Sequence, residues 1–166
     1  MIWESCHWKS DLLKQAASLR KRTVQKRWVD ASFARLEQTI MLGFFSIRKL
    51  MQSAKLTDMA ARQQIAVRSY PPTGKAVTLL NTHRLEQLYD LEEPSERAVS
   101  LPFLCNQVIH SYVFEFQFEE GAGPAAILVA SDRQRSKELL EVSIEAIIEA
   151  FDRVGRDDVS VAKFTF

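Results

Sequence analysis

A run of apolar residues with helical spacing dominates the first third of the chain. Apolar side chains recur at steps of three and four at Val29, Phe33, Leu36, Ile40, Phe44, Ile47, Met51 and Ala54. This spacing predicts one face of an α-helix, about 39 Å long at 1.5 Å per residue. Met41, Leu42 and Phe45 add apolar side chains on its other sides. We therefore expect this helix to lie at the centre of the fold.

A second amphipathic segment, at residues 4–22, precedes this helix. One helical face of the segment carries Trp8, Leu12, Ala16 and Leu19. Because only a short basic connection separates the two segments, we expect the helices to pair antiparallel as a hairpin. A residue near Asp30 or Ser32 is expected to cap the second helix.

Beyond residue 55 the pattern changes to short runs that are typical of strands. Alternating or continuous apolar runs predict strands at residues 65–70, 77–80, 112–118, 125–130, 138–142 and 159–166. The turn Pro71–Gly74 would join the first two as a hairpin. One strand has an aromatic face formed by Tyr112, Phe114, Phe116 and Phe118. We expect the long helix to cover this face, and a bulge near Ala162 in the last strand.

Two further helices are indicated by their end signals. Ser100 and Pro102 predict the start of a helix over residues 101–110, because proline costs no hydrogen bond in a first turn. Ser143 predicts the start of another helix, and Gly155 stands where such a helix would end.

A short helix at residues 82–88 and a charged loop at residues 92–97 complete the expected elements. The pattern favours an α+β fold, in which an antiparallel helical hairpin with a long central helix precedes a small antiparallel β-sheet. Two or three further helices accompany the sheet. We expect a single domain, with the hairpin at residues 1–55 and the mixed portion at residues 56–166.

Composition narrows the class of protein. The chain has 166 residues, of which 46% are hydrophobic and 26% charged, which excludes a disordered or collagen-like chain. Its two cysteines, Cys6 and Cys105, indicate a reducing compartment, and the start of the chain lacks signal-peptide features, so we expect a cytoplasmic location. The most apolar run, residues 40–47, is too short to span a membrane. No metal or cofactor motif is present in the sequence, so we expect neither.

The net charge of +1 hides an asymmetry along the chain. Residues 1–55 hold eleven Lys and Arg against four Asp and Glu, whereas the remainder is acidic. A basic cluster at the junction of the two helices comprises Arg20, Lys21, Arg22, Lys26 and Arg27. One interpretation is an RNA-phosphate contact; the others are a solvated helix end or attraction between the two halves of the chain. The polar segment 131–137 admits the same choice between a phosphate contact and a solvated turn.

The strongest candidate for chemistry is the pair Asn106 and His110. Four residues apart on a helix, both side chains project from one face. A histidine exchanges protons near neutral pH, and a neighbouring amide can orient it or bind a phosphate oxygen. This pairing fits metal-independent cleavage of RNA by its own 2′-hydroxyl. The structural alternative is that His110 ends the helix and Asn106 bonds to a loop.

Asn106-x-x-x-His110, after a hairpin of helices, resembles the core of the Arg-Asn-x-x-x-His motif of the HEPN superfamily. That superfamily is mostly all-helical and includes RNases of toxin–antitoxin and phage-defence systems as well as non-catalytic members. The resemblance implies catalytic roles for Asn106 and His110. Cys105 stands where the motif has its arginine. A supporting arginine would therefore come from Arg48 on the long helix or from the second chain of a dimer.

Two functional hypotheses follow from the sequence. The first is a non-enzymatic intracellular binding or accessory module that forms a homo-oligomer, or binds a protein partner, through exposed parts of its helical hairpin. The second is an RNA-binding or RNA-cleaving HEPN-like protein.

Overall fold

The computed structural model describes residues 1–160, which form six helices and five strands. The helices are α1 (Ser5–Thr23), α2 (Asp30–Gln52), α3 (Asp58–Ala61), α4 (Leu85–Leu88), α5 (Leu101–Ile109) and α6 (Ile144–Arg156). The strands are β1 (Gln64–Tyr70), β2 (Ser95–Ser100), β3 (Ser111–Phe118), β4 (Pro124–Ser131) and β5 (Leu139–Ser143). The α+β fold predicted from the sequence is confirmed.

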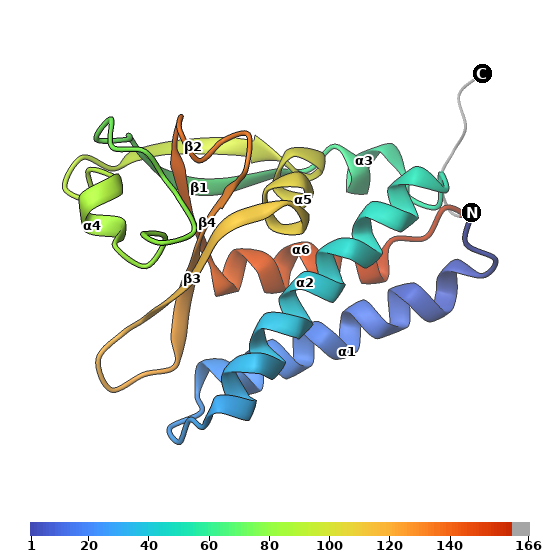
Figure 1. The fold of residues 1–166 in the computed structure, drawn as a ribbon. Helices are drawn as coiled ribbons and strands as arrows, with labels where there is room; N and C mark the ends of the chain where they lie inside the picture. Colours follow the sequence, from blue (N-terminus) through green and yellow to red (C-terminus); the bar gives the residue numbers. More distant parts are fainter. Residues whose placement is uncertain (161–166) are drawn as a thin grey trace.

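The five strands form one antiparallel sheet in the order β2-β1-β5-β4-β3. Helices α1, α2, α5 and α6 cover one face of this sheet and share a continuous apolar core with it. The other face is covered at one end by α4 and its flanking loops, which form a second, smaller core (Figure 1). The N-terminal helices and the mixed portion thus pack through the same core.

Helix α2 runs antiparallel to α1 along this layer (Figure 1) and packs against α1, α5 and α6. Gly43 allows the Phe151 ring of α6 to lie against the backbone of α2. The Phe44 ring packs edge to face on the Phe151 ring, with 5.3 Å between the two ring centroids. The apolar side chains on the other sides of α2 are not all buried, because Leu42 and Phe45 are 57% and 43% exposed. Their side faces away from the sheet and meets no other element within residues 1–160. The dimer expected through this hairpin stays a prediction.

Helix α6 packs along α1, and this contact explains Gly155. A Cβ atom there would lie 2.7 Å from the Leu13 side chain, so glycine allows the close approach of the two helices. The expectation that Gly155 ends the helix is therefore wrong, since α6 continues to Arg156. Lys9 and Asp157 close this contact with a salt bridge of 3.5 Å between side chains that are both 9% exposed.

The prediction that residues 77–80 form a strand and pair with β1 is also wrong. Residues 77–80 form no strand because the Asn81 carboxamide bonds to the backbone of Ala76 and Thr78 instead. Residues 95–100, which include part of the expected charged loop, form β2 and pair with β1. This strand lies at the edge of the sheet, so charged side chains on its solvent side mask the strand pattern.

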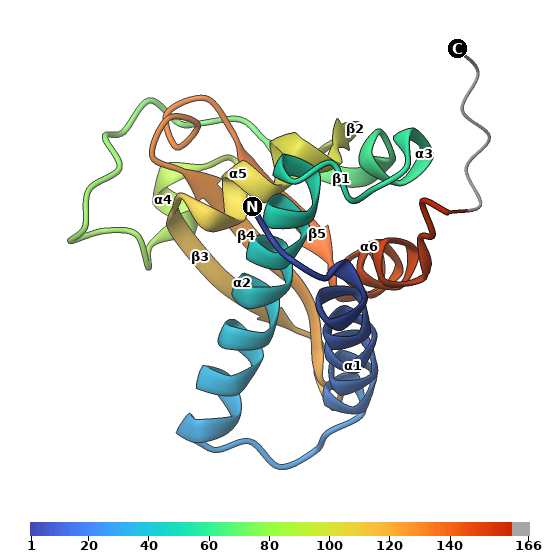
Figure 2. The same ribbon diagram turned by 90° about the vertical axis from the view of Figure 1, so that its right-hand side faces the viewer.

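Strand β3 contains a β-bulge at its first residues. A register shift between Ser111 and Val113 turns Tyr112 toward the smaller core, so the expected four-residue aromatic face is wrong at this position. Phe114 and Phe116 pack against the main core as expected. The β3–β4 hairpin continues to the α1–α2 connection (Figure 2), where the Gly123 N–H donates to the Thr23 carbonyl at 3.2 Å.

The helix caps lie at or next to the positions predicted from the sequence. Ser100 and Ser143 accept hydrogen bonds from Phe103 N and Ala146 N, as predicted. For α2, the residue before Asp30, Val29, takes the N-cap position, and the Ser32 hydroxyl accepts from its N–H.

Residues 159 and 160 form a turn rather than a strand. The rest of the predicted last strand and its bulge near Ala162 lie outside the described residues.

None of the helices in the described part combines the length and apolarity needed to cross a bilayer.

Candidate functional site: a polar pocket at the end of α5

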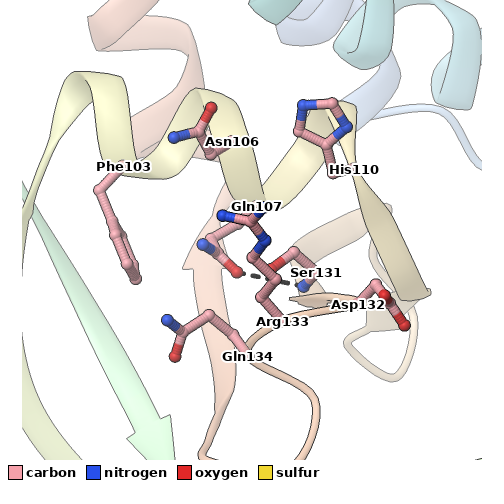
Figure 3. A pocket seen from close by; sticks show the side chains of 8 residues that line it. All are labelled: Phe103, Asn106, Gln107, His110, Ser131, Asp132, Arg133 and Gln134. Carbon is pink, nitrogen blue, oxygen red and sulfur yellow. Dashed lines mark hydrogen bonds between the residues drawn. The ribbon is translucent and has the colours of Figure 1, made fainter.

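A pocket of about 500 Å³ lies between the end of α5 and the segment that follows β4 (Figure 3). It is lined by Phe103, Asn106, Gln107, His110, Ser131, Asp132, Arg133 and Gln134. Asn106 and His110, the two residues singled out in the sequence, both lie on its rim. The structure also brings residues 131–134 of the polar segment 131–137 to the same site.

Helix α5 positions one wall of the pocket. Its apolar side is anchored in the core by Leu101, Leu104 and Val108, all fully buried. Helical spacing then directs Asn106 and His110 outward, and both side chains are exposed. His110 is the C-cap residue of α5, with its backbone N–H directed at the carbonyls of the last turn. Its imidazole forms no hydrogen bond within residues 1–160, so the ring is available to a ligand.

The second wall is held against α5 by two hydrogen bonds. The buried Gln107 accepts the Ser131 N–H on its side-chain oxygen at 3.1 Å (Figure 3). The Asp132 N–H donates to the His110 carbonyl at 3.2 Å. These bonds fix the start of the segment and leave the side chain of Arg133 extending toward α5. Gln107 is not a candidate in the sequence analysis. It lies between apolar residues, and nothing in this local pattern predicts its contact with the end of β4.

Arg48 of α2 lies directly beside Asn106. Its guanidinium donates hydrogen bonds to the Asn106 side-chain oxygen and to the Pro102 carbonyl, the latter at 3.3 Å. The Arg48 Nε atom is buried and has no hydrogen-bond partner among residues 1–160. One of the two sources proposed for a supporting arginine is thus present next to Asn106, from within the same chain.

Cys105 is not suited to act as a nucleophile. It is fully buried, and burial raises its pKa from 9.0 to about 12, although the nearby Arg48 charge lowers it in part. The thiol therefore stays protonated at neutral pH. Its role is to pack α5 against the core.

The charges around the pocket are mainly positive. Arg133 is exposed, and neither it nor Arg48 forms an ion pair within residues 1–160. The Asp132 carboxylate is paired with Arg135 at 3.2 Å, and Arg135 is itself held over the Tyr112 ring at 3.8 Å. The one carboxylate of the pocket wall is therefore partly neutralised, whereas the two guanidinium charges are not.

The basic cluster predicted from the sequence lies elsewhere. It occupies the α1–α2 connection, at the opposite end of α2 from Arg48, about 27 Å along the helix (Figure 1). Arg20 pairs with Asp152, and Arg22 donates to the Gln25 side chain at 2.6 Å. Only the Arg20 pair joins the two halves of the chain, as the alternative of internal attraction predicts, whereas the Arg22 contact stays within the α1–α2 connection. Lys21, Lys26 and Arg27 are exposed and form no ion pair within the described residues.

Residues 1–160 contain no group of three His, Cys, Asp or Glu side chains arranged to hold a metal ion. Comparison of the chain with protein-family models, with curated proteins and with solved structures found no match. The resemblance to the HEPN superfamily therefore stays a hypothesis that rests on Asn106, His110 and their surroundings.

Proposed function

We propose that the chain is a binding module for RNA and that the pocket at the end of α5 holds one of its phosphate groups. The observation that carries this proposal is the convergence of His110, Asn106 and Arg133 on one pocket, with Arg48 behind Asn106. Guanidinium groups suit phosphate oxygens because they present several N–H donors in a planar fork. Arg133 has no competing carboxylate partner within residues 1–160, so its charge is free for such a contact.

The pocket also suits the rest of a nucleotide. Phe103 lines one side with a half-buried ring, and the side chains of Gln107 and Gln134 lie beside it. RNA-binding proteins commonly stack unpaired bases on aromatic rings and bond the base edges through polar side chains. The volume of about 500 Å³ lies within the range of sites for small ligands. These features favour a single-stranded segment over a duplex.

A binding measurement tests this proposal. A fluorescently labelled single-stranded RNA of about 12 nucleotides is titrated with the protein and followed by anisotropy. Arg133→Ala is expected to weaken binding about tenfold, because charge-assisted hydrogen bonds to phosphate are lost. The matched control is Arg62→Ala, which removes an exposed arginine of the α3 region and should leave affinity unchanged. Equal affinities of wild type and Arg133→Ala would refute the pocket as the RNA site.

Metal-independent RNA cleavage is a second candidate, and the Arg48–Asn106 contact favours it. That contact supplies an arginine beside the Asn106/His110 pair, where Cys105 replaces the arginine of the resembled motif. In such a reaction His110 would take the 2′-hydroxyl proton while the 2′-oxygen bonds to phosphorus. The bond from phosphorus to the 5′-oxygen breaks, water protonates the leaving oxygen, and a 2′,3′-cyclic phosphate remains.

The cleavage candidate is tested on the same RNA in the presence of a metal chelator. Wild type is expected to shorten the RNA, and His110→Ala to lower the rate by about 10²–10⁴ while binding is retained. His83→Ala is the matched control, since His83 is an exposed histidine of the α4 region outside the pocket. If wild type and His110→Ala leave the RNA equally intact, the protein is a binding module and not an RNase.

A further inference from the structure

Three aromatic rings from separate parts of the chain meet where the β3–β4 hairpin reaches the α1–α2 connection. Trp28 precedes α2, Phe33 lies in its first turns, and Phe118 ends β3. The centroid of the Trp28 ring lies 5.2 Å from that of Phe33 and 5.3 Å from that of Phe118. The Phe33 and Phe118 rings are 5.6 Å apart. We call these three rings the aromatic platform.

The platform lies at the margin of the main core, because Trp28 packs against that core while the other two rings are partly exposed. Phe33 and Phe118 are 38% and 37% exposed, and Trp28 is half-buried. The Trp28 indole N–H donates to the Gln25 carbonyl at 2.9 Å, which fixes the orientation of the ring. Contiguous exposed aromatic surface of this kind marks a site of interaction more often than isolated apolar residues do.

Two cationic residues adjoin the platform along the chain. Lys26 and Arg27 directly precede Trp28, both are exposed, and neither forms an ion pair within residues 1–160. Glu119 and Glu120 directly follow Phe118 and are also exposed. An anionic ligand that covers the rings would therefore gain from contact with Lys26 and Arg27 and be repelled at Glu119 and Glu120.

Strand β3 connects the platform to the pocket at the end of α5. It begins at the residue after His110 and ends at Phe118, a span of about 26 Å for eight residues. Between them lie the half-buried rings of Phe114 and Phe116, whose inner sides pack against the main core, with centroid separations of 5.3 and 6.4 Å along the series to Phe118. Because β3 is the last strand in the sheet order, its outer edge pairs with no further strand within residues 1–160.

We infer that the aromatic platform stacks the bases of a single-stranded RNA whose phosphates contact Lys26 and Arg27. Aromatic rings beside unpaired cations are the usual means of binding single strands without sequence preference. This inference rests on the proposed function, because the same RNA strand would run along β3 to the pocket. At about 3.4 Å per stacked nucleotide, bridging the two sites takes roughly eight nucleotides.

Trp28 itself provides the readout of base stacking. The substitutions Trp3→Phe and Trp8→Phe, both at the far end of α1, leave Trp28 as the sole indole of the 166-residue chain. Addition of a single-stranded RNA of about 12 nucleotides is expected to quench its emission, since stacked bases contact the ring. Unchanged emission at RNA concentrations that saturate the anisotropy signal would overturn the inference while leaving the pocket proposal intact.

Affinity measurements separate the platform from the pocket. Phe118→Leu keeps an apolar side chain but removes one ring, and it is expected to weaken binding of the RNA of about 12 nucleotides at least about fivefold. Phe45→Leu, which changes an exposed phenylalanine of α2 outside both sites, is the matched control and should bind as wild type. Glu119→Gln with Glu120→Gln should tighten binding. Equal affinities of Phe118→Leu and Phe45→Leu would contradict a stacking role, whatever Arg133→Ala does.

The converse outcome is also informative. If Arg133→Ala binds as wild type while Phe118→Leu weakens binding and RNA quenches Trp28, the pocket proposal fails and the platform is the RNA site. Thermal unfolding of each variant shows whether it is folded at the temperature of the binding measurement, so that loss of structure is not counted as loss of a contact.

Discussion

The guanidinium of Arg48 on α2 donates a hydrogen bond to the side-chain oxygen of Asn106 on α5, across a sequence separation of 58 residues. This contact ties the long helix to the rim of the pocket. It also places a cation beside a residue pair that has none among its immediate sequence neighbours. The orientation of Asn106 toward a ligand therefore depends on how α2 packs against α5.

The coupling between Arg48 and Asn106 is directly measurable. We expect a double-mutant cycle with Arg48→Ala and Asn106→Ala to give an interaction free energy of about 0.5–1 kcal/mol, because the pair is partly open to solvent. Urea unfolding of the four proteins supplies the values. A cycle with Arg35→Ala in place of Arg48→Ala serves as the control, since Arg35 is exposed on the same helix. Additive effects in both cycles would show that the Arg48 contact contributes nothing to stability.

Gly43 is expected to be intolerant of any side chain. A Cβ atom at this position would overlap the Phe151 ring, so Gly43→Ala should lower the free energy of unfolding by about 1–3 kcal/mol. Chemical denaturation measures the loss. Combining Gly43→Ala with Phe151→Leu should cost less than the sum of the two single changes, because the smaller side chain leaves room for the methyl group. Strict additivity would mean that the two residues do not meet.

Stability is expected to fall in alkaline solution. Burial raises the pKa of Cys105 from 9.0 to about 12 and that of Tyr89 from 10.0 to about 12. Above about pH 9 the unfolded chain loses protons that the folded chain retains, so the free energy of unfolding decreases as pH rises, by up to about 1.4 kcal/mol per unit for each group. Urea unfolding between about pH 8 and pH 11 tests this. In Cys105→Ala the free energy of unfolding should fall less steeply with pH. The same slope as in wild type would contradict a raised pKa for Cys105.

A thiol reagent provides an independent check on the same residue. Cys6 is exposed and Cys105 is buried, so the folded protein should react at Cys6 alone and the unfolded protein at both. Rapid labelling of Cys105 in the folded protein would show that α5 opens more readily than its packing indicates.

Salt dependence of RNA binding should identify which basic residues contact phosphate. For single strands the slope of log K against log salt is about −0.7 per phosphate neutralised, so Lys26→Ala with Arg27→Ala should make the slope less negative by about 1.4. Arg20→Ala should leave the slope unchanged, because Arg20 is paired with Asp152. The same slope for wild type and the double variant would place the RNA away from the α1–α2 connection.

Local patterns were sufficient to predict most helices and several strands. The steps of three and four in α2 and the serines before α5 and α6 depend on neighbours within one or two turns, and the structure confirms those elements. Strand β2 was missed because an edge strand carries charged residues that resemble a loop. The sequence does not show whether a glycine ends a helix or permits close packing against another helix. For this reason the prediction for Gly155 was wrong.

The candidate site was only partly visible in the sequence. Asn106 and His110 could be paired from their spacing, because a helix places positions four apart on one face. The contributions of Gln107 and Arg133 could not be assigned, since they depend on the end of β4 meeting the end of α5.

Periodicity and helix capping act over a few residues, so the amino-acid pattern is enough to predict the α+β class, the long second helix and the Asn106/His110 pair. Packing between distant segments sets the strand order, the partner of β1 and the position of Arg48 beside Asn106. It also determines that the basic connection adjoins the aromatic platform rather than the pocket. These relationships arise when distant segments bury apolar surface together, and the energy of that burial depends on shape complementarity across the whole core rather than on any local pattern.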